Sequence, residues 1–448
     1  MADLDAIFKA YDVRGIYPDQ IDSDVARGAG AGFAALMLEE DPGLESVVVG
    51  HDMRPSGPGL VAGFVEGVTS QGVDVVLLGL ASTDMLYYAA GVLNMPGAVF
   101  TASHNPAQYN GIKMCRAGAA PIGEESGLLS IKQRVFDGVP ARPTTGSVTE
   151  RAMLEDFSQH VRGFIDPAKL RPLKIVADTA NGMGGLVVPA VFDHLDIDLE
   201  ILFGELDGTF PNHPADPLNM DNLRDLRARV LETGADLGLA FDGDADRVFL
   251  VDERAEPVSG SLTTAIIASG MLDKHAGATI IHNLICSKTV PEVVAEKGGT
   301  AVRSRVGHSY IKQLMAETGA VFGGEHSGHY YFKDNFRADS GLIAALVILE
   351  QLSVANVALS ELCAPFRRYA ASGEINTTVD DQDAVIQRVS LHFSSLDQDR
   401  LDGLTVDAGS WWFNMRASNT EPLLRLNLEA PTQAEVDQRV SEVQALMS

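Results

Sequence analysis

The chain has 448 residues, of which 46% are hydrophobic and 21% charged, a composition typical of a globular protein and a length that suggests about three domains. Its formal net charge of −27 argues against a protein that wraps nucleic acid, and no apolar run is long enough to cross a bilayer, so we expect neither nucleic acid nor a membrane as partner. The acidic N-terminus lacks a signal-peptide pattern, and the three cysteines have neither a disulfide-framework nor a zinc spacing, which predicts a cytoplasmic location.

The first predicted unit alternates strands with a helix, which implies parallel strands joined by a right-handed crossover. Its predicted elements are a strand at 45–50, a helix at 57–71, and strands at 73–78 and 97–100. Before them, Tyr11–Gly15 places Arg14 beside a glycine, where a guanidinium can meet a phosphate or belong to a simple surface turn. After them comes the polar segment Thr101–Pro106.

Ser103 in this polar segment is a candidate nucleophile. Small neighbours leave room for another group, Pro106 stiffens the loop, and Lys113 follows a turn predicted at Tyr109–Gly111. A serine hydroxyl reacts only when a base, a metal or a strong field activates it. The alternative is a polar loop whose side chains merely cap a helix.

The same plan recurs twice, because predicted strands at 173–178 and 277–283 are each followed by a polar turn and a helix. A Pro/Gly/Thr-rich linker at 137–146, a polar segment at 252–260 and a change of pattern at 364–369 predict domain boundaries. The last predicted elements are a strand at 374–378, a helix at 383–393, a short β run and a helix at 432–446. This predicts a smaller final α+β domain.

The loop Asp242–Arg247 follows an apolar strand and carries aspartates at alternate positions. Carboxylate oxygens without His or Cys suit Mg²⁺ better than zinc. An EF-hand is rejected, although Glu253 has the right spacing, because Arg247 occupies the position where that loop needs glycine. Arg247 fits a phosphate that bridges metal and guanidinium, whereas the plain alternative is a solvated acidic turn.

Two further polar loops have a composition suited to ligands. In Gly323–His329, Glu325 and Ser327 between glycines suit sugar hydroxyls, and His329 can move protons near neutral pH, although an ordinary polar turn fits too. In Arg416–Pro422, a guanidinium, hydroxyls and an amide form the composition of a phosphate nest, or of an ordinary hairpin turn.

In this order the motifs resemble those of the α-D-phosphohexomutase superfamily, most closely its bacterial phosphomannomutase/phosphoglucomutase branch, over the whole chain. The resemblance implies an α/β fold, with three related α/β domains with mixed sheets plus a smaller C-terminal α+β domain around a central cleft. The implied domains are 1–146 with the phosphoserine loop, 147–252 with the metal-binding loop, 253–366 with the sugar-binding loop and 367–448 with the phosphate-binding loop.

The resemblance also implies a role for each motif residue. Ser103 resembles the phosphoserine that carries the transferred group, and Lys113 resembles the proton-transfer residue, with further catalytic roles implied for Arg14, His104 and His329. The implied metal ligands are Ser103, Asp242, Asp244 and Asp246. The implied substrate-binding residues are Tyr11, Arg247, Lys288, His308, Glu325, Ser327, Arg416, Ser418, Asn419 and Thr420.

The implied reaction is an isomerisation in carbohydrate metabolism, in which mannose 6-phosphate and mannose 1-phosphate, and the glucose phosphates, are interconverted. The phosphoserine forms a hexose 1,6-bisphosphate, which turns end for end before the other phosphate is taken back. The implied cofactors are Mg²⁺ and the hexose 1,6-bisphosphate as activator, the implied partners are hexose phosphates, and we expect a monomer or weak homodimer. The alternatives are a phosphoglucosamine mutase, a catalytically silent sugar-phosphate binding protein and a Mg²⁺-dependent phosphatase.

Overall fold

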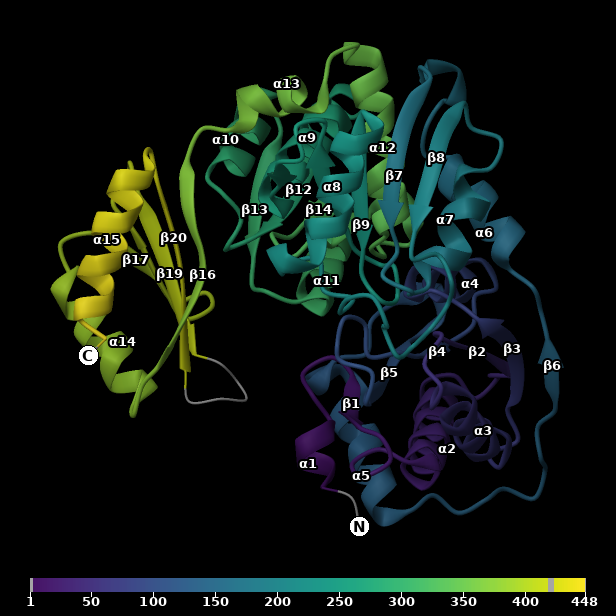
Figure 1. Ribbon diagram of the computed structural model, residues 1–448. Coiled ribbons are helices and arrows are strands. Elements are labelled where there is room, and N and C mark those ends of the chain that lie inside the picture. Colours follow the sequence, from purple (N-terminus) through teal and green to yellow (C-terminus); the bar gives the residue numbers. More distant parts are fainter. Residues whose placement is uncertain (1–2, 418–422, 448) are drawn as a thin grey trace.

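The computed structural model describes residues 3–417 and 423–447, whose strands form four sheets in chain order (Figure 1). The first three sheets combine parallel and antiparallel pairs, and the fourth is antiparallel throughout. The predicted fold class, three α/β units with mixed sheets followed by a smaller α+β unit, is therefore confirmed.

The first sheet has the strand order β1-β5-β4-β2-β3-β6. Its strands are β1 (Val13–Ile16), β2 (Ser46–His51), β3 (Asp74–Leu80), β4 (Gly97–Phe100), β5 (Tyr109–Cys115) and β6 (Val148–Glu150). The helices of this unit are α1 (Leu4–Ile7), α2 (Ser23–Glu40), α3 (Gly57–Thr69), α4 (Thr83–Val92) and α5 (Leu129–Asp137). The apolar runs predicted as strands form the buried centre of the sheet, because β2 pairs in parallel with both β3 and β4.

The turn predicted at Tyr109–Gly111 is wrong, because these residues begin strand β5. Gly111 pairs with Arg14 of β1, and a Cβ at Gly111 would lie 2.3 Å from the carbonyl oxygen of Val13. The glycine thus permits a close approach of two strands and does not mark a reversal of the chain.

The second and third sheets have the orders β11-β10-β9-β7-β8 and β13-β12-β14-β15. Their strands are β7 (Leu173–Asp178), β8 (Ile197–Leu202), β9 (Leu237–Phe241), β10 (Val248–Asp252), β11 (Pro257–Val258), β12 (Thr279–Asn283), β13 (Thr300–Ser304), β14 (Phe322–Gly324) and β15 (Tyr330–Phe332). The accompanying helices are α6 (Leu154–Arg162), α7 (Gly184–Phe192), α8 (Arg224–Thr233), α9 (Gly260–Lys274), α10 (Thr289–Glu296), α11 (His308–Thr318), α12 (Gly341–Ala355) and α13 (Leu359–Cys363).

The first three sheets share one topological feature, a hairpin at the change from parallel to antiparallel pairing. β4 is parallel to β2 and antiparallel to β5, β9 is parallel to β7 and antiparallel to β10, and β14 is parallel to β12 and antiparallel to β15. The three hairpin loops carry Ser103, the aspartates of Asp242–Arg247, and Glu325–His329. The repeated plan predicted from the sequence therefore places each candidate loop at an equivalent position.

The fourth unit has the strand order β16-β20-β19-β18-β17, with two helices. Its elements are β16 (Ala370–Thr378), α14 (Gln382–His392), β17 (Asp397–Asp399), β18 (Leu404–Asp407), β19 (Trp412–Ala417), β20 (Leu423–Ala430) and α15 (Gln433–Ala445). Figure 1 shows this unit to one side of the others. Lys288 of the third unit donates from Nζ to Asp407 at 2.6 Å and from its backbone N–H to Glu429 at 2.9 Å, so polar groups join the two units.

One apolar core is continuous through the first three units, and it includes Tyr87, Val187 and Leu346 from α4, α7 and α12. The fourth unit has a separate core around Phe413. Among the described residues no single helix is long and apolar enough to span a membrane; α12 and the segment Leu359–Phe366 would suffice together by length and composition, but they bend by 96°.

Candidate active site

Ser103 lies in the hairpin loop after β4, where it is 5% exposed and has a left-handed φ of 49°. Its backbone N–H donates to Thr101 Oγ1 at 2.9 Å, and its Oγ donates to Asp242 Oδ2 at 2.7 Å. A Cβ at Gly243 would lie 2.4 Å from the Ser103 carbonyl oxygen. Glycine there lets the aspartate loop of the second unit approach the serine loop of the first.

The aspartate loop forms a buried cluster of charges. The carboxylates of Asp242, Asp244 and Asp246 have ligand oxygens within 4.8 Å of one another. Lys113 Nζ is 2.8 Å from Oδ2 of Asp244 and 2.8 Å from Oδ2 of Asp246. Arg247 Nε donates to Asp242 Oδ2 at 2.8 Å. Two cations therefore face three carboxylates, and Lys113 comes from the first unit.

The charged groups of this cluster differ in their protonation. Burial raises the pKa of Asp242 to about 7, against the opposing charge of Arg247. Burial also opposes ionisation of Asp244, but Lys113 and a 2.6 Å hydrogen bond from Thr83 Oγ1 hold the pKa of Asp244 below its ordinary value. Burial likewise opposes the charge of Lys113, yet the adjacent carboxylates raise the pKa of Lys113 well above its ordinary value. Lys113 is therefore an ammonium ion here.

The cluster also has the donor set of a hard-cation site. The Oδ1 atoms of Asp244 and Asp246 are buried and have no hydrogen-bond partner among the described residues. Carboxylate oxygens without nitrogen or sulfur ligands suit a hard divalent cation such as Mg²⁺. The aspartates predicted as ligands are thus brought together, and the acidic cluster can hold a metal ion.

Cationic and imidazole groups also lie near the serine hydroxyl and its loop. His104 Nδ1 lies 3.3 Å from Ser103 Oγ, and Arg247 Nη2 lies 3.4 Å from the same oxygen. Arg14 of β1 donates from Nη1 to Asn105 Oδ1 at 2.6 Å. The positive charge of Arg247, then burial and the charge of Arg14, lower the pKa of His104 well below its ordinary value. His104 is therefore neutral beside the serine hydroxyl.

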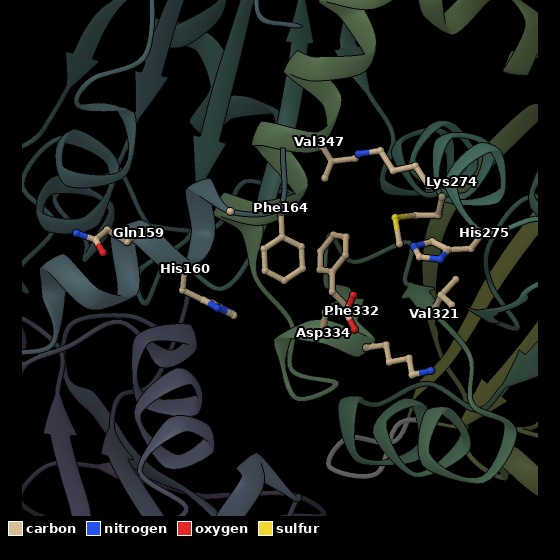
Figure 2. A pocket seen from close by; sticks show the side chains of 12 residues that line it. Gln159, His160, Phe164, Lys274, His275, Val321, Phe332, Asp334 and Val347 are labelled. Atoms are coloured by element: carbon tan, nitrogen blue, oxygen red, sulfur yellow. The ribbon is translucent and has the colours of Figure 1, made fainter. Parts of the chain in front are cut away.

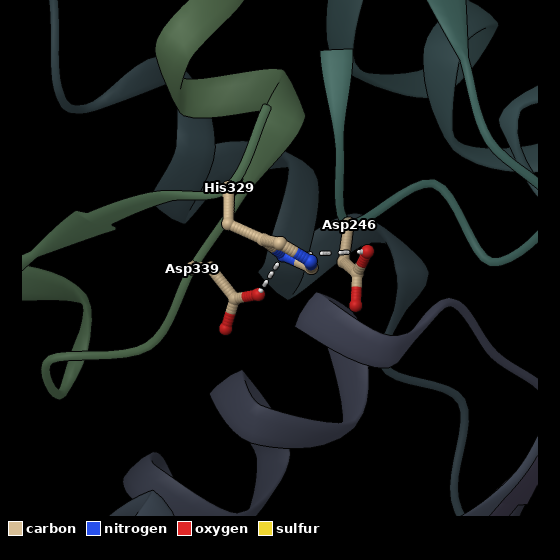
Figure 3. A group of neighbouring side chains, drawn as sticks. All are labelled: Asp246, His329 and Asp339. Carbon is tan, nitrogen blue, oxygen red and sulfur yellow. Dashed lines mark hydrogen bonds and ion pairs between the residues drawn. The ribbon is translucent and has the colours of Figure 1, made fainter. Parts of the chain in front are cut away.

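His329 lies between two carboxylates, Asp339 and Asp246 (Figure 3). Its Nδ1 is 2.8 Å from Asp339 Oδ2 and 3.9 Å from Asp246 Oδ1. Burial opposes protonation of the ring, but these carboxylates raise the pKa of His329 above its ordinary value. Behind them Lys312 Nζ lies 3.2 Å from Asp339 Oδ1 and 3.6 Å from the centre of the Tyr87 ring.

The third hairpin loop brings Glu325 to the same region. Glu325 is 2% exposed and accepts from the backbone N–H of Gly307 at 3.1 Å and from Ser327 Oγ at 3.2 Å. His308, the first residue of α11, has its ring centre 5.1 Å from that of Tyr11. This ring contact joins the third unit to the first.

A cavity of about 1260 Å³ connects these groups, and its lining comes from all four units. The predicted site residues that line it are Tyr11, His104, Arg247, His308, Glu325, Ser327, His329 and Arg416. Ser103 adjoins this cavity, because two of the three groups that contact its Oγ, His104 and Arg247, belong to the lining.

Not all predicted contacts are placed in this cleft. Lys288 is not part of the lining and instead donates to Asp407 and to the carbonyl oxygen of Gly409, so its role as a substrate contact stays a prediction. The predicted phosphate contacts Ser418, Asn419 and Thr420 lie outside the described residues.

Sequence reasoning missed Thr83, Lys312 and Asp339, which support the reacting groups from behind. Each of the three is a polar residue beside or within an apolar segment, which is the only feature of the sequence that points to it. The residues that they contact lie far away in the sequence. Thr83, for example, contacts Asp244 across 161 residues.

A smaller pocket of about 480 Å³ lies elsewhere, near α6, α9 and the β14–β15 hairpin (Figure 2). Phe164 and Phe332 are among its aromatic walls, and His160, Lys274 and His275 are among its polar ones. None of the site residues that were predicted from the sequence lines this pocket. The convergence of reactive groups assigns the site to the larger cleft.

Comparison with known proteins agrees over the whole chain. The family models described as phosphoglucomutase/phosphomannomutase alpha/beta/alpha domains I, II and III match residues 5–139, 155–256 and 259–369, and the C-terminal domain model matches residues 374–446. Phosphohexose mutases of Xanthomonas campestris pv. campestris (strain B100) are 38% identical over 447 residues, which is 98% of either chain. The phosphomannomutase of Salmonella typhimurium is 37% identical over 436 residues, or 94% of either chain.

A solved structure extends the similarity to three dimensions. The chain is similar to a phosphoglucomutase/phosphomannomutase family protein from Burkholderia thailandensis, with a TM-score of 0.91 and 33% identity. The similarity covers 100% of this chain and 97% of the other.

Proposed function

Since the chain belongs to the phosphoglucomutase/phosphomannomutase family and is an intramolecular phosphotransferase of hexose phosphates, we propose that it interconverts mannose 6-phosphate and mannose 1-phosphate, and also the glucose phosphates. The proposal includes a phosphoserine at Ser103 and a hexose 1,6-bisphosphate intermediate. One observation carries it: Ser103 Oγ lies 2.7 Å from Asp242 and 3.4 Å from Arg247, beside a large cleft that is lined by residues of all four units.

In the proposed first step, the bond between phosphorus and Ser103 Oγ breaks, and a bond forms to the free hydroxyl oxygen of a hexose monophosphate. The hydroxyl loses its proton to a base, and the serine oxygen gains one. Lys113 is an ammonium ion in this structure and is the proposed proton donor to the serine oxygen. Arg14, His104 and His329 are proposed to support proton and phosphoryl transfer.

Asp242, Asp244 and Asp246 are proposed to hold Mg²⁺ together with an oxygen of the phosphoserine. The bound ion would supply positive charge where negative charge develops on the transferred phosphoryl oxygens. Arg247, which donates a hydrogen bond to Asp242, is proposed to contact the same phosphoryl oxygens.

The far end of the cleft is proposed to hold the sugar and the phosphate that is not reacting. Glu325 and Ser327 would bind sugar hydroxyls, Tyr11 and His308 would flank them, and Arg416 would bind the phosphate with Ser418, Asn419 and Thr420. The cavity volume of about 1260 Å³ exceeds the range of about 300–1,000 Å³ in which a small ligand is usually enclosed, which supports a bisphosphate that turns within the cleft.

The test is an assay of phosphorylated protein with Mg²⁺, a trace of hexose 1,6-bisphosphate, and mannose, glucose or glucosamine 1-phosphate. We expect 6-phosphates from mannose and glucose, loss of this activity in Ser103→Ala, and normal activity in Ser130→Ala, a change on the surface helix α5. Conversion of glucosamine 1-phosphate alone would favour a phosphoglucosamine mutase. Binding without isomerisation would favour a silent binding protein, and release of inorganic phosphate alone would favour a phosphatase.

A further inference from the structure

Arg54, in the turn after β2, has a buried side chain whose hydrogen-bond donors are all satisfied. It is 1% exposed, and each of its N–H groups has an acceptor. Nε donates to Asp52 Oδ2 at 3.2 Å. The two terminal nitrogens donate to four backbone carbonyl oxygens, those of Ser103 at 2.9 Å, Asn105 at 2.6 Å, Pro106 at 2.8 Å and Tyr109 at 2.9 Å.

These carbonyl groups all belong to the serine loop and the first residue of β5. A loop without strand pairing leaves its carbonyl groups in need of donors, and a buried one cannot use water. Ser103 has a left-handed φ of 49°, which a residue with a side chain adopts only when its surroundings enforce it. The guanidinium of Arg54 forms hydrogen bonds with the carbonyl group of Ser103 and with carbonyl groups that follow it in the chain. These bonds fix the backbone at Ser103 and so the direction of its side chain.

The second unit covers the other face of this arginine. The ring centre of Phe210 lies 5.1 Å from Arg54 Cζ, and a Cβ at Gly208 would lie 2.6 Å from Arg54 Cα. Both residues belong to the segment that follows β8. The guanidinium is thus enclosed by the serine loop and by the ring of Phe210. The second unit therefore contributes both Asp242, which contacts Ser103, and the ring that covers Arg54.

Arg54 does not line the cleft and contacts none of the aspartates of the cluster directly. We propose that Arg54 is a positioning residue for phosphoryl transfer: its guanidinium, oriented by Asp52 and covered by Phe210, holds the serine loop so that Ser103 Oγ faces Asp242 and Arg247. This inference rests on the proposed function in taking Ser103 as the residue that carries the phosphoryl group.

The central test is Arg54→Lys, which keeps the positive charge but replaces a planar fork by a single donor atom that cannot span four carbonyl groups. Displacement of a reacting group by about 1 Å can lower a rate on the order of 100-fold, so we expect kcat to fall by about that factor. KM for the hexose phosphate should change less than about threefold, because the proposed substrate contacts lie elsewhere. Amide hydrogen exchange of residues 103–109 should accelerate, with the rest of the protein unchanged.

The matched control is Arg162→Lys in α6. Arg162 also donates to a backbone carbonyl group, that of Ala190 at 2.7 Å, but it is remote from the serine loop. We expect normal kcat and normal exchange at residues 103–109 in this variant. If Arg54→Lys behaves like this control, the positioning role is overturned.

If Arg54→Lys does not fold, the variant Asp52→Asn tests the positioning role of Arg54 instead. This change preserves the volume and leaves the four carbonyl contacts in place, but it replaces the carboxylate that orients Nε by a neutral amide. Lower kcat with unchanged KM and faster exchange at residues 103–109 would support the proposal, and wild-type values for both would overturn it. Wild-type protein measured in parallel separates the two hypotheses: if it lacks mutase activity the proposed function fails, whereas an active wild type with an equally active Arg54→Lys refutes only the role of Arg54.

Discussion

At the scale of single residues, the Ser103 hydroxyl lies in a cluster of charges that is nearly balanced without a metal ion. Asp242 is paired with Arg247, and Lys113 bridges Asp244 and Asp246. Burial raises the pKa of Asp242 to about 7, so partial protonation of this carboxyl brings the cluster closer to neutrality, as a buried site requires. The residues proposed to carry the chemistry therefore also bear on the stability of the protein.

Lys113→Met should make stability depend on a divalent cation. Without metal, the change leaves two buried carboxylates without their ammonium partner, so we expect the free energy of unfolding to fall by about 3–5 kcal/mol. Thermal denaturation with chelator and with Mg²⁺ checks this, and Mg²⁺ should raise Tm more in the variant than in the wild type. Lys132→Met, which removes an exposed pair with Asp5, is the control and should show neither effect. Equal Mg²⁺ shifts in variant and wild type would contradict the cation site.

At the scale of elements, the reactive groups depend on close contact between strands and loops. β1, which carries Arg14, lies against β5, which carries Lys113, and Gly111 is at the point of closest approach. A side chain at this position would push β1 away from the serine loop, because its Cβ would lie 2.3 Å from Val13 O and 2.9 Å from Thr101 O.

Gly111→Ala should therefore destabilise the first unit by about 1–3 kcal/mol, as overpacking against backbone atoms does. Urea unfolding measures this change. The control is Gly59→Ala in α3, where the nearest atom would be 4.0 Å away and helix propensity improves. The control should be as stable as the wild type or slightly more stable; comparable losses in the two variants would show that the site is not packed as described.

Much at this scale could be predicted from the sequence, and what could not has a physical reason. The loops with Ser103, Asp242 and Glu325 were predictable because each follows a short apolar strand and is itself polar. Asn110-Gly111 was misread because a glycine that permits close approach looks the same in sequence as one that permits a turn. Arg54 could not be assigned, since its partners in the serine loop lie 49 to 55 residues away and are backbone carbonyl groups, which carry no sequence signal.

At the scale of the whole molecule, the fourth unit differs from the others in how it is attached. The first three share one apolar core, whereas the fourth has its own core and meets the third through charged groups around Lys288. Such polar interfaces permit relative motion of domains more readily than a continuous core does. The unit that supplies Arg416 to the cleft is therefore the part expected to move when substrate enters and leaves.

Lys288→Met should loosen this attachment. We expect a larger radius of gyration for the substrate-free protein in small-angle X-ray scattering and a KM raised about 2- to 5-fold, as loss of a partly exposed ion pair worth up to about 1 kcal/mol implies. Lys297→Met removes a similar pair within the third unit, with Asp273 at 2.7 Å, and should change neither quantity. A raised KM with an unchanged radius of gyration would instead identify Lys288 as a direct substrate contact.

The charge cluster between the first two units makes correct association of these units important for stability. Its carboxylates come from one unit and Lys113 from the other, so a chain whose units associate in the wrong register leaves ionised groups buried without partners. Such a molecule would be inactive and also readily unfolded and degraded. The proposed active site would thus link activity to correct association of the first two units, and we expect few molecules that are folded but inactive to accumulate.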